Sequence, residues 1–428
     1  MSEVPEKGSL LSIEDVKVHF PVRSGLMLRQ TGKVKAVDGV SLEIGEGETV
    51  GLVGESGCGK STLAKAVVRL LKPDAGSVTF GGTEITGLSP RVLRPFRREM
   101  QMIFQDPVES LNPRQSVRQI IEEPLVIHRE GDVGARRRRV DELLERVGLP
   151  SNSGEKFAFE FSGGQRQRIG IARAIALNPK FIVCDEPVSA LDVSVQSQII
   201  NLLLELQSEM GISYLFIAHD LAVVQHISDR VAVMYLGKIV ELASAEAIYQ
   251  RPCHAYTKAL LSAIPEADPT AERERILLEG DVPSPINPPE GSAFGHRISH
   301  PRYEETIGMD LSLVEIEPGH WVARDPCCLS EEDWEKVNSV DSPPAVIASS
   351  GVEAAEEKTA VDVYLESAGG DKVAVMEALR AVSSGLSLLD VKEFVENAPT
   401  KVLEGFPRSD AEEAKARLEE AGATVALR

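Results

Sequence analysis

Short apolar runs alternate with amphipathic helical patterns from residue 10 to about residue 268. The run ETVGLVG at 48–54 predicts a strand, and KSTLAKAVVRLL at 60–71 predicts the helix that follows it. FIVCD at 181–185 and ISYLFIAHD at 212–220 predict two more buried strands. Buried strands separated by helices are typical of an α/β fold.

A mostly helical stretch is predicted between these strands, at residues 115–177. Within it, the run ARRRR at 135–139 raises the possibility of a nucleic-acid contact. Apolar residues with helical spacing follow directly: Val140, Leu143, Leu144 and Val147. We therefore favour the simpler interpretation, in which the arginines form the solvated start of an amphipathic helix.

The pattern changes after residue 268. Residues 269–330 are rich in proline and glycine and lose clear periodicity. Residues 331–360 are acidic and then rich in proline, alanine and serine, which predicts a flexible linker. The chain is therefore expected to consist of a main domain at 1–268, an extension at 269–330, a linker at 331–360 and a small domain at 361–428.

The small domain has a regular pattern of its own. VDVYLES predicts its first strand, helical patterns follow at 371–382 and 388–396, and a short strand is predicted near Val402. Ser409 and Glu412 form a capping box that opens a third helix, and TVAL predicts a last strand. The expected order is β-α-α-β-α-β.

Charge and composition restrict the possible functions. The net charge of −20 argues against a nucleic-acid binder, because neutralising phosphates needs a basic surface. The five cysteines have no metal-type spacing, which favours reduced thiols in a cytosol. We see no signal peptide, and no stretch approaches the ~18 apolar residues of a membrane span. Any role at a membrane is therefore expected to depend on a partner.

The segment GESGCGKST at 54–62 fits the phosphate-loop pattern G-x-x-x-x-G-K-[ST]. It lies between a predicted strand and a predicted helix, where such a loop can direct backbone N–H groups at phosphate oxygens. Lys60 is expected to reach the β- and γ-phosphates of a nucleotide, and Ser61 to bind Mg²⁺. The predicted nucleotide-binding residues are Gly54, Glu55, Ser56, Gly57, Cys58, Gly59, Lys60, Ser61 and Thr62.

An acidic pair follows a second buried strand, in FIVCDEP. At the end of a strand, Asp185 can join the Mg²⁺ ligands, and Glu186 can polarise an attacking water. A lone Asp-Glu pair is more often a solvated turn. In a chain that also carries a phosphate loop, we favour the catalytic interpretation.

The segment EFSGGQRQRIGIARAIALNPKFIVCDEPVSALD at 160–192 resembles the nucleotide-binding subunit of an ABC transporter. This resemblance implies a phosphate-loop NTPase cassette with a RecA-like core, an antiparallel β subdomain and a helical signature subdomain. It also implies that two cassettes clamp two ATP molecules head to tail, and that ATP and Mg²⁺ are the ligands. A chain with one cassette must then pair with a copy of itself or with a relative.

The roles of the family carry over to matching positions. Gln105 resembles the glutamine that contacts Mg²⁺ and water, and His219 resembles the switch histidine at the γ-phosphate, so catalysis is expected from Glu186, His219 and Gln105. Asp192 resembles the D-loop aspartate. The expected adenine-stacking residue is Phe20, although a core role is nearly as plausible. The signature that acts on the ATP of the partner is expected at Ser162, Gly163, Gly164 and Gln165, and the Mg²⁺ ligands at Ser61, Gln105 and Asp185.

Three further segments are similar to ATPases of the dipeptide, oligopeptide and nickel importer branch. They are QDPVESLNPRQSVRQIIEEPL at 105–125, YQRPCHAYTKALLSAIP at 249–265 and GDVPSPINPPEG at 280–291. The similarity implies a peripheral subunit on the cytoplasmic side of the inner membrane that powers peptide import. Its implied partners are integral membrane permease subunits, a second ABC ATPase and, indirectly, an extracytoplasmic peptide-binding protein.

Relatives of this branch usually carry cysteines after the NPP segment, and some are thought to hold an iron–sulfur cluster there. This chain has Ser292 and Ser299 where thiols would be expected, and only Cys327 and Cys328 lie further along. Two thiolates are too few for the four that a cluster usually takes. We therefore expect no cluster.

The small domain resembles the C-terminal domain of the bacterial ribosomal stalk protein, through SAGGDKVAVMEALR, GLSLLDVKEFVENAP and DAEEAKARLEEAGATV. In that family, two helices dock translation GTPases. Glu377 and Leu389 stand where lysines are usual, and the domain has 13 acidic and 8 basic residues, so we favour an accessory module with an unknown partner. The docking face, if retained, would include Lys372, Val373, Val375, Arg380, Gly385, Leu386 and Lys392.

Two alternatives to an importer subunit stay open. One is a soluble ABC ATPase that acts on translation or another assembly through its stalk-like domain. Such ATPases usually carry two cassettes in one chain, and this chain has one. The other is a regulatory binding module without hydrolysis, which is disfavoured because Lys60, Asp185, Glu186 and His219 are all present.

Overall fold

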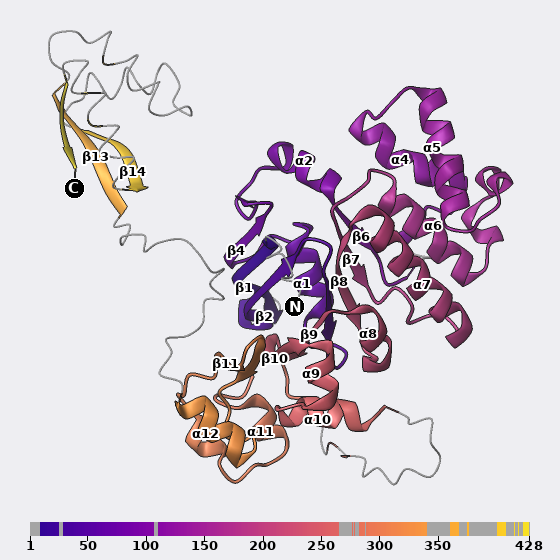
Figure 1. Ribbon diagram of the computed structural model, residues 1–428. Helices are drawn as coiled ribbons and strands as arrows, with labels where there is room; N and C mark the ends of the chain where they lie inside the picture. Colours follow the sequence, from indigo (N-terminus) through magenta and orange to yellow (C-terminus); the bar gives the residue numbers. More distant parts are fainter. Residues whose placement is uncertain are drawn as a thin grey trace, which may run out of the picture. The chain divides into compact units, whose positions relative to one another are not determined.

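A computed structural model describes residues 9–24, 29–106, 110–264, 276, 278, 282–286, 288–339, 360–367, 375, 400–407, 415, 418 and 423–427. The chain forms two compact units, Met1–Ala348 and Ser349–Arg428 (Figure 1). Among the described residues, no helix is both long and apolar enough to span a membrane.

The larger unit is built on an eight-stranded sheet in the order β11-β12-β10-β9-β3-β8-β7-β6. The strands from β9 to β6 are parallel, and every residue of β3, β7 and β8 is buried. Continuous apolar strands are expected at the centre of a parallel sheet, because helices cover both faces. The three predicted strands are confirmed as β3 (Thr49–Val53), β7 (Phe181–Asp185) and β8 (Ser213–Ala218). Three further strands of this sheet were not predicted: β6 (Met100–Ile103), β9 (Arg230–Tyr235) and β10 (Lys238–Ser244).

The helix predicted at 60–71 is shorter in the structure, where α1 is Lys60–Val67. The N–H groups of Leu70 and Leu71 both donate to the Lys65 carbonyl, and Arg69 adopts a left-handed φ of 56°. The chain therefore turns before Pro73 instead of continuing the helix. The other helices that follow the strands are α7 (Val193–Met210), α8 (Leu221–Ile227), α9 (Ala245–Gln250) and α10 (Ala255–Ser262).

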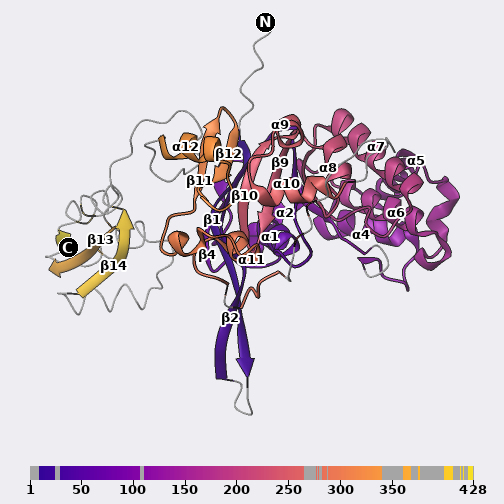
Figure 2. The same cartoon turned by 90° about the horizontal axis from the view of Figure 1, so that it is seen from below.

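A second, antiparallel sheet has the order β2-β1-β4-β5. Its apolar face and α1 share one hydrophobic core with residues of the main sheet. Figure 2 shows the far end of the β1–β2 hairpin standing clear of the rest of this unit. This sheet is the antiparallel subdomain implied by the family resemblance. Its strands are β1 (Ser9–Ser24), β2 (Arg29–Gly45), β4 (Ala75–Phe80) and β5 (Thr83–Glu84).

The stretch predicted to be mostly helical forms a helical subdomain. Its long helices are α4 (Val117–His128), α5 (Val133–Arg146) and α6 (Gly163–Ile175). The predicted apolar face of α5 is buried, so the arginines before it lie at the start of an amphipathic helix, as expected. The shorter elements of this region are η1 (Ser151–Glu155) and η2 (Ala158–Glu160). Helix α2 (Pro90–Glu99) precedes this region, and its Leu93 joins the core of the antiparallel sheet.

The predicted break at residue 268 differs from the structure. The extension supplies two strands of the main sheet, because β12 pairs with β10 through Trp321 and Val322, and β11 pairs with β12. The first residues of the predicted linker instead form a helix, α12, with Val337 fully buried. The rest of the predicted linker lies outside the described residues. The elements of this region are α11 (Ala293–Arg297), η3 (Tyr303–Thr306), β11 (Leu313–Glu317), β12 (His320–Ala323) and α12 (Glu331–Ser339).

The smaller unit contains an antiparallel sheet in the order β14-β13-β15, which confirms its three predicted strands. Val375 is fully buried, so its expected place on an exposed docking face is wrong. The other residues of that face, with Glu377 and Leu389, lie outside the described residues. So do most residues of the predicted helices. The strands are β13 (Ala360–Ser367), β14 (Thr400–Pro407) and β15 (Thr424–Leu427).

Candidate active site

The predicted phosphate loop connects β3 to α1. Two of its glycines have no room for a side chain: a Cβ on Gly54 would lie 2.1 Å from the Met234 carbonyl oxygen, and one on Gly59 would lie 2.0 Å from that of Ala36. Both have positive φ, which favours glycine. Around Gly57 there is open space instead. The sequence therefore folds here into a tight loop with one open side.

Lys60 is buried beneath this loop. Its Nζ donates to the carbonyl oxygens of Gly54, at 2.7 Å, and Glu55, at 3.0 Å. The start of α1 has no acidic residue in its first turn and no side-chain cap. Free N–H groups at a helix start and a nearby ammonium group together favour an anion.

Ser61 and Asp185 meet across the sheet. The Ser61 hydroxyl donates to Asp185 Oδ1 at 2.8 Å, although the two residues come from α1 and from the end of β7. Burial raises the pKa of Asp185, while the bond from Ser61 and the nearby lysines lower it in part. The Ser61 hydroxyl and the Asp185 carboxylate both offer oxygen ligands, and the charge of the buried carboxylate is only partly compensated. Such a pair is suited to bind a hard cation such as Mg²⁺.

Glu186 lies next to these groups, in a left-handed conformation with φ of 45°. Its Oε2 accepts a hydrogen bond from Gln105 Nε2 at 2.9 Å and lies 3.6 Å from His219 Nδ1. The side chain of Glu186 is 14% exposed and that of His219 is 57% exposed. A cavity of about 30 Å³ beside Glu186, Ser189 and His219 has room for a water molecule. The three predicted catalytic residues therefore come together.

The predicted signature and D-loop lie at two neighbouring helix starts. Ser162 caps α6 and forms a capping box with Gln165, and Asp192 caps α7 by accepting from Val195 N at 3.1 Å. A Cβ on Gly164 would lie 2.4 Å from Val195, so the two helix starts are in contact. Ser162, Gly163 and Asp192 are exposed. This arrangement leaves both helix starts open to a partner.

Phe20 lies on β1 opposite Val34 and is 40% exposed. Phe20 lies within β1, which continues to Ser24. Adenine stacking at Phe20 stays a prediction. In the phosphate loop, Cys58 is buried, and burial raises the pKa of its thiol.

One part of the site was missed by the sequence reasoning. Arg297, at the end of α11, donates to both oxygens of the Glu55 carboxylate, at 2.6 and 3.2 Å. The Tyr256 hydroxyl, from α10, accepts from Glu55 N at 2.8 Å. The only sequence signal was a charged residue inside the phosphate loop, and that signal does not identify a partner.

Two small groups of buried polar residues lie where the extension meets β10 and the start of α10. Each group holds a single thiol: Glu241, Cys253 and His320 form one, and His254, Asp325 and Cys328 form the other. Ser292, where a thiol was expected, caps α11 and donates to Asp325. The expectation that no iron–sulfur cluster forms stays a prediction.

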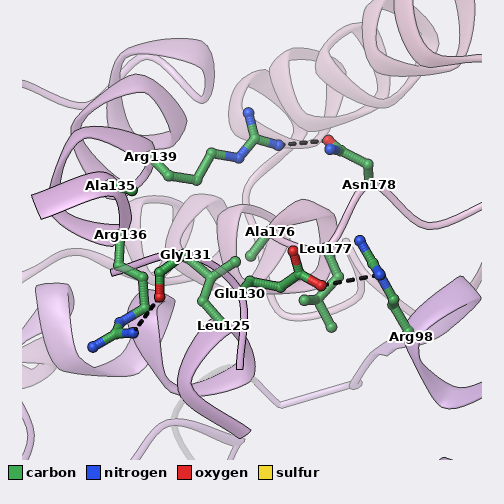
Figure 3. A pocket seen from close by; sticks show the side chains of 10 residues that line it. All are labelled: Arg98, Leu125, Glu130, Gly131, Ala135, Arg136, Arg139, Ala176, Leu177 and Asn178. Carbon is green, nitrogen blue, oxygen red and sulfur yellow. Dashed lines mark hydrogen bonds and ion pairs between the residues drawn. The ribbon is translucent and has the colours of Figure 1, made fainter. Parts of the chain in front are cut away.

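A cavity of about 200 Å³, drawn in Figure 3, lies between the end of α2, the segment that joins α4 to α5, and the residues that follow α6. Arg136 donates to the Gly131 carbonyl, Arg139 donates to Asn178, and Arg98 pairs with Glu130. These arginines are thus paired within the domain. None of the predicted site residues lines this cavity.

Comparison with known proteins agrees with this geometry. A family model described as ABC transporter matches residues 37–189, and one described as oligopeptide/dipeptide transporter, C-terminal region, matches residues 240–301. A model described as ribosomal protein L7/L12 C-terminal domain matches residues 361–428.

Two relatives are similar to most of the chain. The oligopeptide transport ATP-binding protein AppF of Bacillus subtilis is 52% identical over 320 residues, which cover 74% of this chain and 96% of AppF. The oligopeptide transport ATP-binding protein OppF of Escherichia coli is 50% identical over 323 residues, covering 72% and 97%.

Solved ABC cassettes share the fold. The ATP-binding cassette MJ0796, in a dimeric post-hydrolysis state bound to ADP and phosphate, is 29% identical with a TM-score of 0.50. The matched region is 55% of this chain and 98% of the MJ0796 chain. CbiO1 of Clostridium perfringens is 28% identical with a TM-score of 0.50, covering 57% and 92%. With the phosphate loop, the acidic pair and the signature helix in one cassette, the chain belongs to the ABC ATPases, in the family of oligopeptide transport ATP-binding proteins.

Proposed function

We propose that this chain is the subunit that hydrolyses ATP to power a peptide importer. The observation that carries the proposal is the meeting of Lys60, Ser61 and Asp185 with Glu186, Gln105 and His219 at the ends of parallel strands. Ligands of open α/β sheets bind at this edge. One site can therefore hold the nucleotide and activate water.

The side chains have distinct roles in the proposed hydrolysis. Lys60 leaves the loop carbonyls and pairs with the β- and γ-phosphates of ATP. Glu186, oriented by Gln105, accepts a proton from the water that attacks the γ-phosphorus. The bond to the leaving oxygen of ADP breaks, and phosphate is released. His219 faces the γ-phosphate and stabilises its developing charge.

Ser61 and Asp185 would hold Mg²⁺, with Gln105 as a further ligand. Their oxygens suit a hard cation. The positive charge of the cation would offset the cost of burying the Asp185 carboxylate, which raises the pKa of that group. When bound, the ion neutralises charge on the phosphate oxygens.

The signature acts on the ATP of a second cassette. Ser162 and Asp192 make only local cap contacts in the described part of the chain, and both helix starts are exposed. Exposed helix starts favour the phosphates of a nucleotide presented by a partner. The complete unit is thus a dimer, with a copy of this chain or with a sister ATPase.

The peptide substrate is proposed from the relatives, whose printed names are those of oligopeptide transport ATP-binding proteins. Integral permease subunits would contact the segment after Gln105, on the cytoplasmic side of the membrane. An extracytoplasmic peptide-binding protein would supply the solute. Adenine would stack on Phe20.

Affinity purification of the full chain from membranes and from the soluble fraction tests this proposal. The expected result is recovery of integral permease subunits, together with ATPase activity that needs Mg²⁺. Recovery of ribosomes or translation GTPases without a permease would instead favour the soluble alternative, acting through the domain at 361–428.

A further inference from the structure

The C-terminal extension contacts the phosphate loop through Arg297, which pairs with Glu55. All three polar parts of Glu55 are held by different elements. Its carboxylate accepts from Arg297 of α11, its N–H donates to Tyr256 of α10, and its carbonyl accepts from Lys60 of α1. The conformation of this loop residue is therefore fixed from three sides.

The ion pair between Arg297 and Glu55 is well formed. It is bidentate, with Nη1–Oε2 at 2.6 Å and Nη2–Oε1 at 3.2 Å. The side chain of Arg297 is 6% exposed and that of Glu55 is 28% exposed. Paired, two-pronged contacts of this kind are stronger and more specific than exposed surface pairs.

Arg297 is itself held in place by its short helix. Ser292 caps α11 by accepting from Gly295 N at 2.8 Å, and it donates to Asp325. Phe294 packs against the rings of Tyr235 and Tyr256, at centroid distances of 5.5 and 5.4 Å. The helix therefore presents Arg297 from a rigid support, which favours a defined side-chain position.

Charge gives this contact a consequence for nucleotide binding. Glu55 is an acidic residue in the loop that would receive the phosphates of ATP, and like charges at close range repel. Arg297 offsets the charge of that carboxylate and holds the Glu55 side chain in one position. A loop that is already ordered loses less entropy when it binds a ligand.

We propose that Arg297 is a positioning residue through which the C-terminal extension sets the ATP affinity of the phosphate loop. The inference rests on the proposed function, because it assumes that ATP binds at this loop. It assigns a role in nucleotide binding to the extension, whose family model ends at residue 301.

Variants that remove one or both charges of the ion pair test the proposal in the purified full chain. ATP affinity is measured in EDTA, which prevents hydrolysis, and KM and kcat are measured with Mg²⁺. Arg297→Gln is expected to weaken ATP binding about tenfold, because it leaves Glu55 unpaired near the phosphates. At saturating ATP, kcat should stay within about twofold.

The double variant provides the sharpest readout. Glu55→Gln serves as the single-variant reference of the cycle, and adding it to Arg297→Gln should restore most of the lost ATP affinity, because it removes the unpaired carboxylate from the loop. Arg297→Lys keeps the positive charge but loses the bidentate contact, so its ATP affinity should lie between those of the wild type and Arg297→Gln. Arg302→Gln is the matched control, because it breaks an exposed ion pair with Glu305 in the same extension.

Two results would overturn the inference: an Arg297→Gln variant that binds ATP like the control, or a double variant as weak as Arg297→Gln alone. If Arg297→Gln fails to fold, the lysine variant and the double variant still decide. A wild-type chain that binds no ATP would refute the proposed function itself, which is a separate outcome.

Discussion

Glu186 is the residue on which the proposed hydrolysis depends most directly. Replacing it with Gln keeps the hydrogen-bonding shape beside Gln105 and His219 but removes the proton acceptor. We expect Glu186→Gln to lower kcat by about 100-fold or more, since general bases contribute on that scale. ATP should still bind, and a nucleotide-bound dimer should accumulate in size-exclusion chromatography. Normal turnover in this variant would contradict the assignment.

Asp185 is expected to reduce the stability of the nucleotide-free protein. Its pKa is raised by burial, so the folded state binds more protons than the unfolded state at a given pH. Stability is therefore lost as pH rises from the unfolded pKa of Asp through the folded one. Asp185→Asn removes this cost and still accepts from Ser61.

We therefore expect Asp185→Asn to raise the melting temperature at pH 7 while abolishing Mg²⁺-dependent hydrolysis. The gain should shrink as pH falls through the folded pKa, which thermal melts at several pH values can follow. A lower melting temperature at pH 7 would show that Asp185 stabilises the nucleotide-free fold.

At this scale, the sequence predicted most of the site. The phosphate loop is a local motif, and Asp185 and Glu186 follow a strand that is apolar throughout, so adjacency along the chain was sufficient. Arg297 could not be found in the same way, because 242 positions separate it from Glu55. Only the packing of α11 brings them together.

The contact between β10, β12 and α10 depends on one buried carboxylate. Glu241, on β10, accepts from the N–H groups of Cys253 and His254, at 2.7 and 3.0 Å, and lies 2.9 Å from His320 Nε2. Burial raises the pKa of Glu241, but the hydrogen bonds from His320 and from the Cys253 N–H outweigh it and lower the pKa. The stability that this group contributes is therefore present above the unfolded pKa of Glu and lost as pH falls through the folded one.

Glu241→Gln should lower the free energy of unfolding by about 3 kcal/mol, because its amide group turns N–H donors toward other donors. Urea titration measures this loss. Glu317, on β11, forms an exposed ion pair with Arg251. Glu317→Gln breaks this pair and should lower the free energy of unfolding by less than about 1 kcal/mol. Equal losses would show that Glu241 is no more important than a surface group.

Element prediction succeeded where periodicity was strong and failed where packing decided. The three central buried strands, β3, β7 and β8, were predicted within a few residues, whereas β6 and β9 were not predicted. In contrast, β11 and β12 are only 5 and 4 residues long, and their burial is irregular. Helix α12 begins with Glu331, Glu332 and Asp333, so its sequence is typical of a linker. It is ordered because Val337 packs with Cys253, Val314 and Val322.

The division of the whole molecule into two units makes the smaller one dispensable for chemistry. Deleting 361–428 should leave basal ATPase activity within about twofold, because every described residue of the site lies in the larger unit. Steady-state assays of the full and shortened chains measure this. Collapse of activity on deletion would show that the small domain is part of the cassette.

A truncation after residue 301, where the family model of the extension ends, is the informative contrast. It would remove β11 and β12 and leave the edge of β10 uncovered. Exposed sheet edges pair with other chains, so this shorter protein should be largely insoluble. A soluble product would show that β12 is not needed to protect β10.

The late position of β12 also has a consequence in time. On a ribosome, the chain up to Ser244 is made before His320–Ala323 exists, and Arg297 likewise comes after the phosphate loop that it contacts. At about 5–20 residues per second, β10 waits roughly 4–15 seconds for the strand that covers it. The nascent cassette therefore spends this interval with an open edge, when a chaperone would be most useful to it.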